Sequence, residues 1–145
     1  MANNPSKTSN TVQIIQKIQL SDIDIHGLID ITELPDIGSV LNTYMGKRDI
    51  STAALFERAG LNRTYGFRVM NGQRIPSRDV LLRLAVVLQL DIEQTQYLLK
   101  CAEEAPLSGR RQRDIVLLKL LHEKVDLMDA EDLLVELDLE PLMSK

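Results

Sequence analysis

Two short helices joined by a tight turn are the feature of this sequence that most constrains its fold. Ser51 can accept a hydrogen bond at the start of a first helix, and Gly60 can end that helix because glycine tolerates the left-handed conformation. Asn62 can cap a second helix that runs to Asn71 and Gly72, a dipeptide that also tolerates positive φ. The two helices must therefore meet at an angle.

A longer pattern extends from Ile50 to Leu88 around this turn. It reads I-S-x-x-x-L-x-x-x-x-G-L-N-R-T-x-x-x-R-V-x-N-G-x-R-x-P-S-x-x-x-L-x-x-L-A-x-x-L. This pattern resembles the DNA-binding domain of the lambda-repressor-like (Cro/CI, XRE-type) helix-turn-helix family. The resemblance implies an all-α protein with a five-helix DNA-binding domain over residues 36–105. It also implies that a recognition helix at residues 62–70 lies in the major groove of DNA.

The expected DNA contacts fall into two groups. Base edges are expected to be read from the first turns of the second helix by Arg63, Thr64, Tyr65 and Arg68. Arginine forks match the O6 and N7 acceptors of guanine. Phosphate contacts are expected near the helix ends and beyond, from Thr52, Asn62, Asn71, Arg74 and Arg78. The alternatives are that the arginines contact phosphate without sequence choice and that Asn71 only terminates the helix.

Three residues depart from the family pattern. Thr52 stands where the family usually has a Gln that braces the DNA backbone and the recognition helix. Gly66 stands in the middle of the recognition helix, where the family has Ile or Val, and Phe56 replaces a small Ala. A glycine inside a helix costs about 1 kcal/mol relative to Ala. We expect Phe56 to fill the space over Gly66, so that the core volume is conserved.

Charge is distributed unevenly along the chain. The net charge is −4, but residues 47–83 contain eight basic and three acidic residues. The rest of the chain has nine basic and eighteen acidic residues. Phosphate attraction depends on the local field, so a basic module on an acidic body remains a candidate for binding DNA.

The segment after the motif contains an internal repeat with an offset of 35 residues. Residues 77–107 align without gaps on residues 112–142, with eight identical positions among 31. Each copy has the pattern of two helices joined by a turn with an Asp cap. The alternative is chance similarity between leucine-rich amphipathic helices. The helix after Ser77 is apolar on two sides, and the second copy is expected to cover the second side.

The predicted organisation has three parts. Residues 1–35 form an N-terminal arm, disordered over 1–10, helical over 11–20 and ambiguous over 21–31. Residues 36–105 form the helix-turn-helix domain, and residues 106–145 form an acidic helical hairpin packed on it. Phosphate repels this hairpin, so it should face away from DNA and serve packing, dimerisation or a protein partner.

Other classes of site find little support. Cys101 is a single cysteine, and no P-loop or dinucleotide motif is present. His26 and His122 lie in different segments without a nucleophile nearby, so no enzyme activity, cofactor or metal is expected. The absence of a signal peptide or a long apolar run favours a cytoplasmic protein without membrane contact.

The preferred interpretation is a sequence-specific regulator of transcription that binds double-stranded DNA as a homodimer. The family resemblance implies two half-sites about 34 Å apart. The alternative is a protein interaction module that keeps the helix-turn-helix fold without reading DNA.

Overall fold

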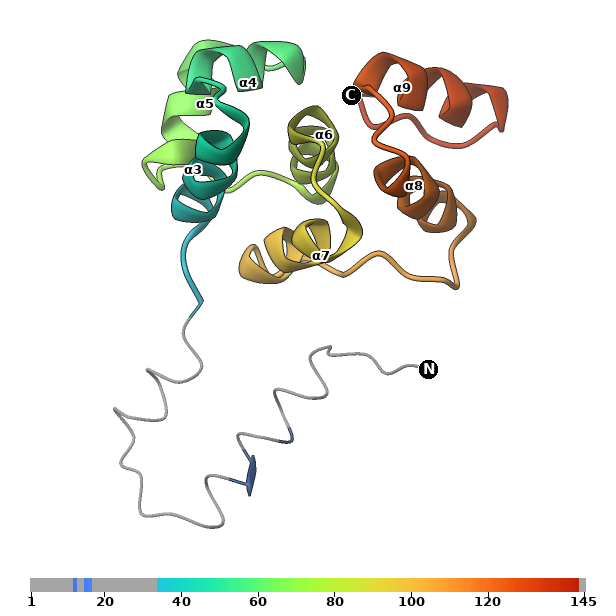
Figure 1. The fold of residues 1–145 in the computed structure, drawn as a ribbon, viewed down its shortest axis with the longest axis horizontal. Coiled ribbons are helices and arrows are strands. Elements are labelled where there is room, and N and C mark those ends of the chain that lie inside the picture. The colour runs from blue at the N-terminus through green and yellow to red at the C-terminus, as the bar shows by residue number, and fades with distance from the viewer. Residues whose placement is uncertain (1–11, 13–14, 17–33, 144–145) are drawn as a thin grey trace. The chain divides into compact units, whose positions relative to one another are not determined.

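The computed structural model describes residues 12, 15–16 and 34–143. The predictions for residues 1–33 lie outside the described residues except at 12, 15 and 16. Over residues 34–143 the secondary structure is helical, as predicted, and no strand occurs in this range. The helices are α3 (Ile37–Arg48), α4 (Thr52–Arg58), α5 (Arg63–Met70), α6 (Arg78–Leu88), α7 (Ile92–Cys101), α8 (Gln112–His122) and α9 (Leu127–Glu136) (Figure 1).

Short polar side chains set where most of these helices begin. Ser51 accepts from the amide of Ala54 at 3.1 Å and Asn62 accepts from the amide of Tyr65 at 2.7 Å, which confirms both predicted caps. Each cap satisfies one of the amides that a helix leaves without a partner at its start. Four more helices begin in the same way, at Asp36, Ser77, Asp91 and Asp126.

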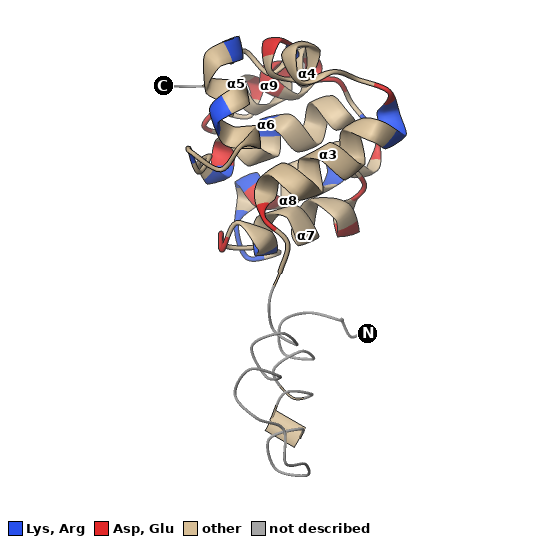
Figure 2. Ribbon diagram, turned by 90° about the vertical axis from the view of Figure 1, so that its left-hand side faces the viewer, with Lys and Arg blue, Asp and Glu red and all other residues tan. Residues whose placement is uncertain are grey.

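Helix α6 is the centre of the core. It packs against α3 and α4 on one side and contacts α7 and α9 on others (Figures 1 and 2). Leu81 and Leu84 are fully buried. Leu82 and Val86, on the second apolar side of α6, are almost fully buried. The packing of α9 on α6 explains how a helix that is apolar on two sides stays out of water.

Residues that are equivalent in the predicted 35-residue repeat form equivalent hydrogen bonds. In the first hairpin, formed by α6 and α7, Arg78 donates to the carbonyl oxygens of Ala105 and Pro106. In the second hairpin, formed by α8 and α9, Arg113 donates to the carbonyl oxygens of Glu140 and Pro141. Each arginine thus ties the start of its hairpin to the end of the same hairpin.

Backbone conformation repeats with the same offset. Gln89 and Lys124 have φ of 54° and 57°, and Glu103 and Asp138 have φ of 58° and 62°. Positive φ is uncommon for residues other than glycine. Chance similarity between leucine-rich helices does not explain such matches, so the two hairpins are copies of one structural unit.

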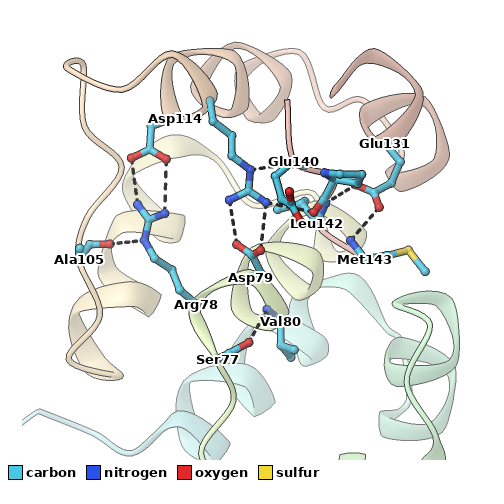
Figure 3. Close-up of polar contacts among 12 residues, drawn as sticks. Ser77, Arg78, Asp79, Val80, Ala105, Asp114, Glu131, Glu140, Leu142 and Met143 are labelled. Atoms are coloured by element: carbon cyan, nitrogen blue, oxygen red, sulfur yellow. Dashed lines mark hydrogen bonds and ion pairs between the residues drawn. The ribbon is translucent and has the colours of Figure 1, made fainter. Parts of the chain in front are cut away.

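The hairpins contact each other reciprocally (Figure 3). Arg78 pairs with Asp114 at 3.0 Å, and Arg113 pairs with Asp79 at 3.0 Å, so each arginine pairs with the aspartate next to the other arginine. Gln89 donates to the carbonyl oxygen of Lys124, and the Lys124 ammonium donates to that of Gln89. Reciprocal contacts of this kind define a twofold relation. The second hairpin therefore covers the first as one subunit of a symmetric dimer would cover its partner.

Candidate nucleic-acid interface

The turn between α4 and α5 has the predicted geometry. Gly60 has a φ of 76°, and the amide of Leu61 donates to the carbonyl oxygen of Phe56 at 2.8 Å. Leu61 is partly buried and packs against the core. At the other end of α5, Gly72 has a φ of 85°. Both positive-φ positions carry glycine, which can take this conformation without steric cost.

Phe56 fills the space over Gly66, as predicted. A Cβ atom on Gly66 would lie 2.7 Å from Cγ and 2.8 Å from Cδ2 of Phe56, closer than real contacts allow. Phe56 is fully buried, and its ring makes an edge-on contact with Tyr65 at a centroid distance of 6.4 Å. The ring on α4 therefore supplies the bulk that a larger side chain on α5 would otherwise provide.

Helix α5 separates cleanly into an exposed and a buried face. Because successive residues turn by about 100°, the exposed residues span roughly 140° of the helix circumference. They are Arg63, Thr64, Phe67, Arg68 and Asn71. Gly66 and Val69 on the other face are buried. The structure thus brings Arg63, Thr64 and Arg68 onto one accessible surface.

Tyr65 stands apart from that surface. Its ring is half-buried between Phe56 and the guanidinium of Arg74, whose Cζ lies 5.6 Å from the ring centroid. Burial raises the pKa of the Tyr65 phenol, although the charges of Arg74 and Arg83 act in the opposite direction. This arrangement gives Tyr65 a packing role that the spacing of α5 alone did not indicate.

The residues predicted to hold phosphate have different surroundings. Thr52 is the first residue of α4 and is half-buried, whereas Asn62 and Arg74 are exposed. Asn71 ends α5, and its side-chain oxygen accepts from the amide of Gln73 at 3.2 Å. Asn71 therefore has the helix-terminating role that was the alternative to a phosphate contact.

Arg78 differs from the prediction. Its Nε and both terminal nitrogens donate to Ala105, Pro106 and Asp114, and its side chain is 18% exposed. Every nitrogen of the guanidinium therefore has a protein acceptor. The sequence could not show this, because Asp114 lies 36 residues away in the second hairpin.

Two residues that support the interface were missed. Gly38 in α3 lies against the carbonyl group of Met70, and a side chain there would overlap that carbonyl. Arg83 in α6 donates to the carbonyl oxygen of Ala59 at 3.1 Å, just before the turn. A glycine inside a helical pattern is the one available signal for such a close approach. Gly38 thus lets α3 approach the end of α5, and Arg83 links α6 to the end of α4.

Six exposed basic residues remain around this motif. They are Lys47, Arg48, Arg58, Arg63, Arg68 and Arg74. Figure 2 shows basic residues along α5 and acidic residues on α9. Of the acidic residues in the second hairpin, Glu131 accepts from the amides of Leu142 and Met143, so its carboxylate holds the chain end in place. The charge difference expected from the sequence is thus retained at the surface.

Other kinds of site are not evident in the described part of the chain. No group of three or more His, Cys, Asp or Glu side chains there could hold a metal ion. Burial raises the pKa of the Cys101 thiol, partly offset by Tyr97 and Lys100. None of the described helices has the length and apolar character needed to cross a bilayer.

Comparison with known proteins agrees with this geometry. Residues 36–98 match a family model described as a helix-turn-helix domain. The match runs from the cap of α3 into α7 and includes all of α4, α5 and α6. No curated protein and no solved structure matches the chain. Residues 36–98 are therefore a helix-turn-helix domain, consistent with the lambda-repressor-like, XRE-type family that the sequence resembles.

Proposed function

We propose that this protein is a sequence-specific regulator of transcription that binds double-stranded DNA and acts in the cytoplasm. The observation that carries the proposal is the exposed face of α5, where Arg63, Thr64 and Arg68 have no covering element among the described residues. In helix-turn-helix proteins the second helix of the motif enters the major groove, and arginine forks there bind guanine. We assign base contacts to these three residues.

Phosphate contacts are assigned to exposed groups around α5. Arg74 follows the helix, Asn62 precedes it, and Asn71 ends it. Thr52 is a fourth contact: it is half-buried at the first residue of α4 and stands where the family usually has a Gln. Arg78 is not included because its guanidinium is bound to the second hairpin. The rest of the exposed basic residues strengthen the local field without specifying sequence.

Homodimerisation forms part of the proposal, but not through the second apolar side of α6. That side is covered by the second hairpin of the same chain. Two copies on adjacent half-sites therefore need another contact surface. Light scattering of the free protein and of its complex with DNA measures whether one or two chains bind each site.

Selection from random DNA duplexes tests the proposal most directly. The intact chain should enrich a defined sequence, and its affinity should fall steeply as salt concentration rises. Enrichment of no sequence, together with weak binding that is equal for all duplexes, would reject a sequence-specific regulator.

A protein interaction module is the second candidate. The departures at Thr52 and Gly66 favour it, and so do exposed apolar residues on α9, where Met128 is 66% and Val135 is 62% exposed. Such a module would bind its protein partner without binding duplex DNA. The same selection experiment separates the two candidates.

A further inference from the structure

Phe67 lies within the exposed face of α5 and is the one large apolar residue there. It is 49% exposed and is not among the apolar side chains that pack against the core. Arg63 lies one helical turn before it and Asn71 one turn after it, while Thr64 and Arg68 lie beside them on the same face. Its aromatic ring thus stands among guanidinium, hydroxyl and amide groups.

The fold does not require an aromatic residue at this position. Phe56 and Tyr65 already provide the ring packing on the inward side of the motif. Polar residues form helices at least as well as Phe. Isolated apolar residues are ordinary on protein surfaces, but this one lies at the centre of the surface assigned to base contacts. Its position therefore indicates that Phe67 contacts the ligand that this surface binds.

The major groove presents one kind of apolar group to a protein, the C5-methyl of thymine. We propose that Phe67 reads a thymine by packing its ring against this methyl group, beside the bases contacted by the arginines. This inference rests on the proposed function, since it needs α5 in the major groove. It adds a preference for an A·T pair that arginine, a guanine reader, does not supply.

Replacing thymine with deoxyuridine tests the inference. Deoxyuridine keeps the base pair and lacks only the methyl group. Each thymine of the selected duplex is replaced in turn, and Kd is measured for the intact chain and for Phe67→Ala. We expect one thymine in each half-site whose replacement raises Kd about fourfold, the factor that corresponds to burial of one methyl group. Phe67→Ala should bind the duplex with thymine and the duplex with deoxyuridine at that position equally.

Two variants serve as controls. Thr64→Ser removes the one side-chain methyl group on this face, which could itself pack against thymine, and should leave the deoxyuridine effect unchanged. Ile75→Ala alters an apolar residue that is 79% exposed but lies outside α5, and it should also leave the effect unchanged. Since Phe67 is outside the core, Phe67→Ala should keep the melting temperature. If it does not, Phe67→Gln provides a second variant with a longer side chain.

Three results would overturn the inference. In the first, no deoxyuridine replacement weakens binding although the chain binds its selected sequence. In the second, the effect persists in Phe67→Ala, so another side chain contacts the methyl group. In the third, no duplex is selected at all, which rejects the proposed function itself and the inference with it.

Discussion

Arg78 and Asp114 form the more buried of the two reciprocal ion pairs that join the hairpins. The Asp114 side chain is 3% exposed, whereas its counterpart Asp79, which pairs with Arg113, is 35% exposed. Asp114 also accepts from the amide of Ser108 at 2.9 Å. The two pairs are equivalent in geometry and unequal in solvation, so their loss should have unequal consequences.

Arg78→Ala should destabilise the fold more than Arg113→Ala. Both substitutions remove a pair of hydrogen bonds to carbonyl oxygens, so each variant controls for the other. Arg78→Ala also leaves a buried carboxylate without its partner, which costs about 3 kcal/mol, against about 1 kcal/mol for a partly exposed pair. Urea unfolding measures both values. Equal losses would show that the burial of Asp114 has no energetic consequence.

Gly66→Ile should destabilise the helix-turn-helix, because its side chain would overlap the ring of Phe56. We expect a loss of about 1–3 kcal/mol from overpacking, even though Ile is a better helix former than Gly. The double variant Phe56→Ala with Gly66→Ile reverses the exchange of large and small residues and should recover much of the loss. Thermal unfolding of the two single variants and the double variant gives the coupling. Strict additivity would contradict the proposed compensation.

Arg68→Ala should change which DNA sequence is bound. Loss of one arginine fork is expected to raise Kd about tenfold and to remove the preference at one base pair. Arg74→Ala should instead weaken binding to all sequences and reduce the salt slope by about 1. Arg110→Ala alters an exposed arginine outside the matched domain and should change neither quantity. Competition binding on the selected site and its single-base variants distinguishes these outcomes.

Cys101 should react slowly with alkylating reagents in the folded protein. Burial raises the pKa of its thiol above the usual 9.0, and the thiolate is the reactive form, so the reactive fraction at pH 8 is reduced. We expect modification by iodoacetamide to be severalfold slower than that of free cysteine and to accelerate in urea. A rate in the folded protein equal to that of free cysteine would contradict this prediction.

Local features of the fold were predictable from the sequence. The caps at Ser51 and Asn62 and the positive φ at Gly60 depend on groups within three or four residues of each other. The 35-residue repeat was also visible, because each hairpin keeps its own internal contacts. Even the packing of Phe56 on Gly66 followed from a matched pair of departures from the family pattern.

Contacts between distant segments depended on the tertiary structure. Arg78 was predicted as a phosphate contact, and the fold pairs its guanidinium with Asp114. Tyr65 was predicted as a base contact, and the fold leaves its ring half-buried against Phe56 and Arg74. An arginine or a tyrosine can serve either role, since both have apolar and polar parts. The sequence by itself determined the helices, their ends and the repeated unit. Only the tertiary structure decided which side chains are engaged in contacts within the motif and between the two hairpins, and which remain exposed on α5.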